Sequence, residues 1–328
     1  MSDSKFTPRD TQIAIKTIKD YFQINLAKSL NLYRVTAPLF VRPQTGLNDN
    51  LSGVEKAVNF SIRKYDIDVE IVQSLAKWKR QALKNYGFNM HEGIYTDMNA
   101  IRADEELDEL HSIYVDQWDW EAIINDNERN ESVLTDTVKK IYEIFKNTEK
   151  MISEKYPSLP CNKLPDEITF IHSDELLKIY PNLEPDEREK MISKDKKAVF
   201  IIGIGENLSD GKPHSLRSPD YDDWKLNGDI IFWNPIINNS IELSSMGIRV
   251  NKDSLISQLE IAKKTDRLSQ DYHRALINNE LPQTIGGGIG QSRICMFFLQ
   301  KRHIGEVQCS IWDNDTIEAC KRQKINLL

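Results

Sequence analysis

A glycine-rich run near the end of the chain constrains its fold more than any other segment. The run reads Pro282-Gln283-Thr284-Ile285-Gly286-Gly287-Gly288-Ile289-Gly290-Gln291-Ser292-Arg293. Glycines let the backbone pass close to a flat ligand, because no side chain stands in the way. The apolar residues 294–299 follow directly and predict a buried helix with Arg293 in its first turn, where an arginine can lie over a purine ring or bind a phosphate. The pattern favours a nucleotide site, although a glycine-rich turn beside a solvated arginine has the same pattern.

Charge and cysteine usage exclude several classes of function. The chain has 328 residues, a formal charge of -7 and four cysteines without a Cys-x-x-Cys pair. The negative charge argues against a mainly electrostatic grip on nucleic acid. No apolar stretch approaches the roughly 18 residues of a membrane helix, and the polar N-terminal residues lack the apolar core of a signal peptide. We therefore expect a cytoplasmic protein with reduced thiols that binds neither nucleic acid nor a membrane.

The spacing of apolar residues predicts a mixed fold. Helical spacing occurs over 15–26, 74–85, 130–153, 173–180 and most of 252–279, and strand patterns occur at 33–38, 58–62, 69–73, 113–120, 168–171, 198–205, 229–233 and 241–245. The strands come in neighbouring pairs with helices gathered before and between them, which favours an antiparallel sheet over regular βαβ units. We expect an α+β fold, an antiparallel sheet flanked by helices, in a single domain over residues 1–328. The candidate boundary at 156–160 is short, and the loop over 205–224 is long enough to be functional.

Three short acidic clusters precede the glycine run, at 45–53, 116–121 and 219–224. Each joins carboxylates to tryptophan, glycine or amide residues. A carboxylate beside a bulky ring is partly desolvated, and its burial is costly unless it binds a cation. Any one cluster alone fits a solvated surface loop. Three clusters in one chain favour a ligand with an ammonium group, a metal ion, or both.

Two basic segments balance these acids. Lys77 and Arg80 share one face of the helix predicted from 74, and Lys79 lies on another face. Arg102 stands between an apolar stretch and the acidic run 104–106. It fits a solvated loop, or an arginine that clamps a phosphate with acids nearby to hold Mg²⁺.

The remaining polar patterns are less specific. Glu242 and Ser244 lie on one face of the strand predicted over 241–245, which suits a metal ligand beside a hydroxyl and equally an ordinary half-exposed strand. The six histidines show no metal-ligand spacing, and no Gly-x-Ser-x-Gly elbow or Walker loop occurs. The sequence therefore disfavours zinc and covalent catalysis.

Longer segments of the chain resemble a known family. The arginine–acid segment at Arg102 and the Gly-Gly-Gly-x-Gly-x-x-Arg segment resemble motifs two and three of class II aminoacyl-tRNA synthetases, and Tyr33–Pro38 resembles the proline-ended first motif. More specifically, the chain is similar, nearly end to end, to the ammonia-dependent asparagine synthetases related to the aspartyl-tRNA synthetase core. That similarity rests on DNLSGVEKAV from Asp49, SLAKWKR from Ser74, HSIYVDQWDWE from His111, PDYDDW from Pro219, LNGDI from Leu226, ELSSMGIR from Glu242 and PQTIGGGIGQSR from Pro282. The single residue between Trp224 and Leu226 is a departure, since family members carry longer insertions there.

The resemblance implies a fold, a reaction and an assembly. The fold would be a class II synthetase catalytic core, and the protein a homodimer built on the first motif. The reaction would convert L-aspartate, ATP and ammonia into L-asparagine, AMP and pyrophosphate through a β-aspartyl adenylate, with Mg²⁺ accompanying ATP. A carboxylate oxygen is a poor leaving group, so ATP first turns the carboxylate into an anhydride.

The resemblance also implies roles for individual residues. Arg102 would hold the α-phosphate and the β-carboxylate. Gln117 would orient the activated carbonyl, and Asp49 would attract ammonium and take its proton. The ends of aspartate would be recognised by Ser74, Lys79, Asp119, Asp222, Ser245 and Arg249. ATP and Mg²⁺ would be served by Asp229, Glu242 and Arg293, with Arg293 stacked on adenine.

Two other functions fit parts of the pattern. One is an aspartyl- or asparaginyl-tRNA synthetase reduced to its core, which the lack of an anticodon-binding domain before the first predicted helix argues against. The other is a regulatory paralogue that binds an amino acid or nucleotide without catalysis. The presence of Asp49, Arg102 and Gln117 disfavours the second alternative, and the negative charge disfavours the first.

Overall fold

The structure is a computed structural model that describes residues 6–49, 51, 55–159 and 164–328. The acidic segment around Asp49 and the candidate boundary at 156–160 both extend beyond these ranges, and Cys161 lies outside them. Among the described residues, no helix is both long and apolar enough to cross a membrane.

Helices and runs of consecutive strands follow one another along the described chain without regular alternation. The α-helices are α1 (Pro8–Leu30), α2 (Ala76–Tyr86), α3 (Glu131–Lys155), α4 (Ser173–Ile179), α5 (Pro185–Lys196), α6 (Lys252–Ile261), α7 (Asp271–Ile277), α8 (Gln291–Phe298) and α9 (Asn314–Arg322). The strands are β1 (Leu32–Arg34), β2 (Phe40–Val41), β3 (Asn59–Ile62), β4 (Ile67–Ile71), β5 (Gly93–Ile101), β6 (Tyr114–Ile123), β7 (Thr169–His172), β8 (Ala198–Ile202), β9 (Asp222–Asn234), β10 (Asn239–Arg249) and β11 (Thr284–Gly290). Short 3-10 turns occur at Pro43–Thr45, Arg63–Tyr65, Asp126–Glu128, Thr265–Ser269 and Ile304–Glu306.

The main sheet has eight strands in the order β1-β5-β6-β11-β10-β9-β8-β7. The pairs from β5 to β8 are antiparallel, and the two edge pairs, β1–β5 and β7–β8, are parallel. Parallel neighbours need a crossover connection, and α4 and α5 supply one between β7 and β8. The predicted α+β fold with an antiparallel sheet is thus confirmed for the centre of the sheet, while its edges are mixed.

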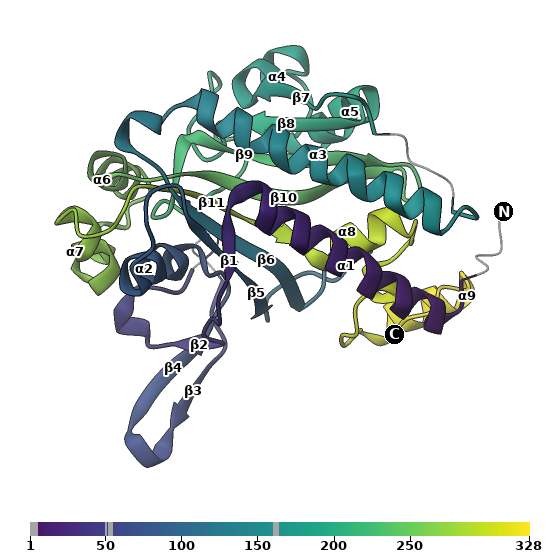
Figure 1. Cartoon of the computed structure of the whole chain (residues 1–328), viewed down its shortest axis with the longest axis horizontal. Helices are drawn as coiled ribbons and strands as arrows, with labels where there is room; N and C mark the ends of the chain where they lie inside the picture. The colour runs from purple at the N-terminus through teal and green to yellow at the C-terminus, as the bar shows by residue number, and fades with distance from the viewer. Residues whose placement is uncertain (1–5, 50, 52–54, 160–163) are drawn as a thin grey trace.

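Helices α1, α3 and α8 cover one face of this sheet (Figure 1). Alternation along β6 sends Trp118 and Trp120 into the core beneath them, where the Trp118 ring stacks on Phe22 of α1 with 5.1 Å between ring centroids. The residues that alternate with these tryptophans, Gln117 and Asp119, face the opposite side of the sheet and line a pocket. The polar face predicted for this strand is therefore present, and it is the face that carries the candidate site.

A second, three-stranded sheet projects away from the main body (Figure 1). Its order is β2-β4-β3, with both pairs antiparallel. Phe40 and Phe60 of this sheet are 41% and 42% exposed, although their rings pack edge to face. Apolar rings left so open mark a surface that another molecule could cover.

Several predicted elements have different bounds in the structure. The strand expected over 33–38 ends at Arg34, and the strands expected near 229 and 241 are the middles of the long hairpin β9–β10. Strand β5 was not predicted, because most of its residues are buried, so it lacks alternation of apolar and polar residues. Helices α5 and α9 were also missed: charged residues dominate both, and each buries only a few side chains.

Candidate active site

The glycine run is a strand in the middle of the main sheet. A Cβ on Gly286 would lie 2.0 Å from Glu121 Oε2, and one on Gly288 would lie 2.4 Å from Gln117 Oε1 and 2.9 Å from Asp119 Oδ1. The alternate glycines of β11 therefore make room for polar side chains of the adjacent strand β6. The interpretation of the run as a glycine-rich turn is wrong. The expected helix follows as α8, and Arg293 lies in its first turn.

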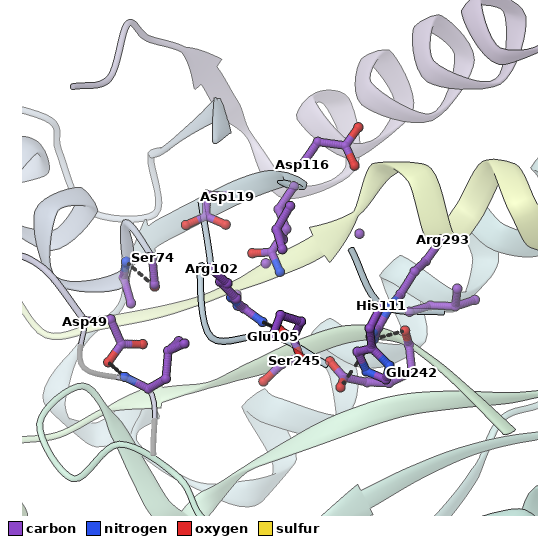
Figure 2. Close-up of a pocket in the computed structure, with 18 of the residues that line it drawn as sticks. Asp49, Ser74, Arg102, Glu105, His111, Asp116, Asp119, Glu242, Ser245 and Arg293 are labelled. Carbon is purple, nitrogen blue, oxygen red and sulfur yellow. Dashed lines mark hydrogen bonds and ion pairs between the residues drawn. The ribbon is translucent and has the colours of Figure 1, made fainter. Parts of the chain in front are cut away.

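A pocket of about 310 Å³ opens over this polar face of the sheet. Figure 2 shows Asp49, Ser74 and Asp119 at one end and Glu242 and Arg293 at the other, with the Arg102 side chain between them. The following predicted residues line the pocket: Asp49, Ser74, Lys79, Arg102, Gln117, Asp119, Asp222, Glu242, Ser245, Arg249 and Arg293. Residues from separate parts of the chain thus meet in one cavity, and of the predicted set Asp229 alone does not line it.

Asp49 is a buried carboxylate with an unused acceptor. Its Oδ1 accepts a hydrogen bond from the Leu51 backbone at 3.1 Å, and its Oδ2 has no hydrogen-bond partner among the described residues. Asn48 fixes the segment, because its Oδ1 accepts from the backbone of Asp49 at 3.0 Å and of Gln73 at 2.9 Å. Burial raises the pKa of Asp49, and the nearby charge of Lys77 opposes that rise. The carboxylate can therefore accept a proton more readily than an exposed aspartate.

Lys79 and Asp119 form a buried pair beside Asp49's end of the pocket. Lys79 Nζ lies 3.2 Å from Asp119 Oδ2 and donates to the Gly287 carbonyl at 2.9 Å. Burial lowers the pKa of Lys79, and the Asp119 carboxylate opposes the shift. Asp119 Oδ1 is buried without a hydrogen-bond partner among the described residues. A cationic group of a ligand would satisfy that oxygen.

Arg249 is held between two acids on the same face. Its guanidinium donates to Glu121, with Nε 2.9 Å from Oε1 and Nη2 2.8 Å from Oε2, and it makes a short ion pair with Asp222. Burial by itself would raise the pKa of Glu121, but the Arg249 guanidinium outweighs it and the pKa is lowered. Thr284 adds a hydroxyl donor to Glu121 at 2.7 Å. Arg249 is thus already oriented before any ligand arrives.

A second buried charge cluster, missed by the sequence analysis, lies behind Asp49. Asp220 Oδ2 accepts from Lys77 Nζ at 3.1 Å, from Arg267 Nη1 at 2.9 Å and from His273 Nε2 at 3.0 Å. Burial opposes ionisation, but Lys77 and the other partners hold the pKa of Asp220 well below its usual range. The cluster anchors the loop before β9 to α2 and α7. Its only sequence signals were Lys77 at a buried helical position and the aspartate-rich 219–224 segment.

The basic residues at the start of α2 have different partners although all are buried. Lys77 pairs with Asp220, and Lys79 pairs with Asp119. Arg80 donates instead to backbone carbonyls, Nε to Pro282 and Nη1 to Val250, both at 2.7 Å. Helix α2 therefore ties the pocket face of the sheet to the end of β10 and to the segment just before β11.

Arg102 and Arg293 supply positive charge to the middle and far end of the pocket. Arg102 Nη1 is 3.7 Å from Glu105 Oε2, and its buried Nε has no hydrogen-bond partner among the described residues. Arg293 Nη1 donates to the Glu242 carbonyl at 3.0 Å and lies 3.6 Å from Glu242 Oε2. Both guanidiniums can accept an anionic ligand on their free edges.

A bulge in β10 decides which of its residues face the pocket. The pairing with β9 shifts between Glu242 and Ser244, so one extra residue enters β10 at that point. As a result Glu242 and Ser245 line the pocket, whereas Ser244 is buried and does not. The prediction that Glu242 and Ser244 share one face is therefore wrong, because a pattern of period two cannot anticipate a bulge.

Asp229 is covered by an arginine that the sequence analysis missed. Arg217 Nη2 lies 2.6 Å from Asp229 Oδ1, and Nη1 makes a short hydrogen bond to the Ser245 hydroxyl. Burial raises the pKa of Asp229 to about 6, an effect that Arg217 opposes and the charge of Glu242 reinforces. Among the described residues no group of three histidine, cysteine or carboxylate side chains could hold a metal ion. Arg217 stood in the long loop predicted to be functional, as a single arginine before the acidic 219–224 segment.

Not every acid of the three clusters serves the pocket. Asp116 lines the pocket, but its carboxylate is engaged by the scaffold: it accepts from Lys19 Nζ at 2.9 Å and from the backbone nitrogen of Ser292 at 3.1 Å. It therefore supports the start of α8, one residue before Arg293. Asp223 likewise pairs with Arg129 of the segment before α3. The clusters mix ligand-facing acids with acids that fix the scaffold.

The main sheet and its helices have the fold of a class II aminoacyl-tRNA synthetase catalytic core. The chain matches the asparaginyl-tRNA synthetase of Pyrococcus horikoshii complexed with asparaginyl-adenylate at a TM-score of 0.67 and 16% identity, over 91% of this chain and 68% of that one. It matches the aspartyl-tRNA synthetase of Entamoeba histolytica at a TM-score of 0.61 and 16% identity, over 91% of this chain and 58% of that one. At such low identity these likenesses establish the fold alone.

The sequence places the chain more narrowly. The profile of the aspartate-ammonia ligase family matches residues 9–324. An aspartate–ammonia ligase of Ruminiclostridium cellulolyticum is 58% identical over 321 residues, which are 98% of this chain and 95% of that protein. One from Bacillus cytotoxicus is 55% identical over 327 residues, covering 100% of both chains. The chain belongs to the aspartate–ammonia ligase family, and the family predicted from its sequence segments is confirmed.

Proposed function

We propose that the chain is a single catalytic domain, over residues 1–328, that makes L-asparagine from L-aspartate, ammonia and ATP. The product would form through a β-aspartyl adenylate, with release of AMP and pyrophosphate. The observation that carries the proposal is the buried Asp49 carboxylate, with an unused oxygen, at one end of a pocket that holds Arg102 in its middle. Membership in the aspartate–ammonia ligase family supports the same reaction.

The end of the pocket near Lys79 suits the α-amino and α-carboxyl groups of aspartate. Asp119 Oδ1 is the free acceptor for an ammonium group, and Ser74 lines the same pocket. Arg249 and Lys79 supply the positive charge that a carboxylate needs, while Asp222 and Ser245 complete the set. These groups are fixed by buried partners before the ligand arrives, so little ordering is required on binding.

Adenylation needs positive charge where the β-carboxylate meets the α-phosphate. Arg102 stands between the two ends of the pocket, with its Nε free, and would hold both groups as charge builds on phosphorus. The carboxylate oxygen forms a bond to phosphorus, and the bond to the leaving pyrophosphate breaks. Arg293, in the first turn of α8, would stack on adenine at the far end.

Amidation needs a group that takes a proton from ammonium. Asp49 would bind ammonium through its free Oδ2, accept one proton and release ammonia to attack the adenylate carbonyl. Gln117 would orient that carbonyl by hydrogen bonding. The carbon–nitrogen bond forms, the nitrogen loses one proton to solvent, and the carbon–oxygen bond to AMP breaks, which leaves asparagine and AMP.

Asp229 and Glu242 would hold Mg²⁺ together with the phosphates of ATP. Burial and, to a smaller extent, the charge of Glu242 raise the pKa of Asp229, and a cation shared by the two carboxylates would offset both effects. Two carboxylates plus substrate phosphates are a common set of ligands for Mg²⁺. When bound, the ion would neutralise charge on the polyphosphate.

The proposed protein is a cytoplasmic homodimer that requires no nucleic acid or membrane. A negative net charge supports the absence of nucleic acid as a partner. Exposed apolar side chains near the first motif support a second copy as partner: Ile24 of α1 and Tyr33 of β1 are 62% and 52% exposed. Sedimentation at twice the 38.0 kDa of one chain is the expected result, and a monomer would contradict the dimer.

The test of the reaction is a stoichiometry measured without tRNA. The protein is mixed with aspartate, ATP, Mg²⁺ and ammonium, and asparagine and AMP are quantified together. Equal amounts of both products are expected. Turnover of ATP to AMP without asparagine would overturn the proposal, and aspartate transferred to added tRNA would instead favour the synthetase alternative, which the fold of the structural neighbours also fits.

A further inference from the structure

Arg217 bridges the neighbouring strands β9 and β10 at the site proposed for the ATP phosphates. Asp229 and Ser245 are directly paired in these strands, and the Arg217 guanidinium contacts both side chains. Arg217 belongs to the long segment between β8 and β9, so it reaches the sheet from outside it. A loop residue, rather than a sheet residue, therefore supplies this positive charge.

This contact closes Asp229 off from the pocket. Arg217 lines the pocket and Asp229 does not, and the side chains are only 12% and 11% exposed. A divalent cation could bind Oδ1 of Asp229 only after the guanidinium has moved away, because Arg217 Nη2 already donates to that oxygen. The Arg217 guanidinium thus occupies the position at Asp229 that a metal ion would take.

The guanidinium also has an unused donor. Its buried Nε makes no hydrogen bond to any described residue, as is true of Arg102 Nε in the same pocket. A buried guanidinium N–H without an acceptor is costly, and phosphate oxygens are the acceptors that its planar fork matches best. Two incompletely bonded arginines in one pocket suit a polyphosphate better than a single phosphate.

We propose that Arg217 exchanges partners when ATP binds: it leaves Asp229 to Mg²⁺ and binds the β- and γ-phosphates. The inference rests on the proposed function and assigns a polyphosphate-binding residue beyond the set derived above. Each charged group keeps an opposite charge in the exchange, since Mg²⁺ replaces the guanidinium at Asp229 and the guanidinium pairs with the phosphates of ATP. Pyrophosphate, once cleaved, remains bound to Arg217 until it leaves.

The test compares nucleotides that differ only in their β- and γ-phosphates. Binding of ATP and of AMP is measured by calorimetry with Mg²⁺, without aspartate or ammonium, for the wild type, Arg217→Gln and Arg217→Lys. Lys212→Gln is the matched control, an exposed charge removed from the same loop. Arg217→Gln should weaken ATP binding about tenfold or more, which is the loss of a charge-assisted contact, and leave AMP binding within about twofold. Arg217→Lys should recover part of the loss, and the control should bind both nucleotides as the wild type does.

A second readout does not involve nucleotide. Binding of Mn²⁺ alone, followed by electron paramagnetic resonance, should be about tenfold tighter in Arg217→Gln, because Asp229 is no longer covered. Equal weakening of ATP and AMP, or unchanged Mn²⁺ affinity, would overturn the exchange and leave Arg217 with a structural role. If the wild type bound no ATP, the proposed function itself would be wrong. That result is distinguishable from failure of the exchange, because it is seen before any variant is compared.

Discussion

Replacing Asp49 with asparagine separates the two chemical steps of the proposed reaction. Asparagine has nearly the same size and can keep the hydrogen bond from Leu51, so the pocket keeps its shape. It cannot take a proton from ammonium. The free Oδ2 of the wild type becomes either an amide NH₂ or a neutral carbonyl, and neither attracts ammonium as a carboxylate does.

The size of the effect follows from the role of the group. General-base catalysis contributes about 10²- to 10⁴-fold, which corresponds to about 2.7 to 5.4 kcal/mol at 1.36 kcal/mol per decade. Asparagine synthesis should fall by that factor. The aspartate-dependent exchange of pyrophosphate into ATP should stay within about threefold of the wild type, since adenylation requires no base. Asp119→Asn is the matched variant in the same pocket, and it should weaken aspartate in both assays.

The pH dependence of asparagine synthesis also tests the role of Asp49. Burial raises the pKa of Asp49, and the base acts only when ionised, so asparagine synthesis should fall on the acid side at a pH above the usual range of an aspartate. The folded protein binds the Asp49 proton more tightly than the unfolded chain does. Protonated Asp49 therefore adds to the free energy of unfolding at low pH, and this contribution is lost as the pH rises through the raised pKa. Asp49→Asn should therefore be at least as stable as the wild type at neutral pH. Equal losses of exchange and synthesis would refute the reasoning, because Asp49 would then act in substrate binding.

Three further perturbations test other parts of the site. In Gly288→Ala, the added Cβ would lie 2.4 Å from Gln117 Oε1, so kcat should fall at least tenfold because that amide is displaced. Gly290→Ala is the control: its nearest contact is at 3.3 Å, and it should keep most activity. Equal losses in the two variants would contradict the packing argument. Arg293→Lys should raise the KM for ATP far more than that for aspartate, since a planar stack is lost, and an unchanged KM for ATP would refute the assignment. Asp220→Leu removes the anion shared by three buried basic groups and should cost about 3–5 kcal/mol in urea unfolding; a loss under about 1 kcal/mol would show that they need no counter-ion.

Much of the fold was predictable because most elements follow simple periodicity. Helix α3 was expected over 130–153 and spans Glu131–Lys155, since its apolar residues recur every three or four positions. The alternation in β6 placed Trp118 in the core and Gln117 in the pocket. Strand β5 escaped because it is buried on both faces, and periodicity carries no signal there.

The glycine strand shows why local rules were insufficient at the site. A run of glycines predicts a turn from local propensity, yet β11 is a strand because its neighbour β6 places Glu121, Gln117 and Asp119 where side chains would otherwise be. The bulge in β10 and the contact of Arg217 with Asp229 have the same origin. Each depends on which segments lie side by side, which spacing along one chain does not specify.

The family resemblance predicted the set of pocket residues more reliably than it could predict their contacts. Motifs distant in sequence, from Asp49 to Arg293, do line one cavity. Their partners were not predictable, because ion pairs such as Arg249 with Glu121 join residues 128 positions apart. The individual roles of these residues stay predictions.

The most direct test of the central claim follows oxygen from aspartate into AMP. Aspartate labelled with ¹⁸O in both oxygens of its β-carboxylate is converted with ATP, Mg²⁺ and ammonium, and the products are weighed by mass spectrometry. An attack of ammonia on a β-aspartyl adenylate breaks the bond between the carbonyl carbon and the bridging oxygen, so AMP should gain one ¹⁸O and asparagine should keep one. AMP without label, formed alongside asparagine, would mean that the carboxylate never bonded to phosphorus, and the account of Arg102 and Asp49 would be wrong.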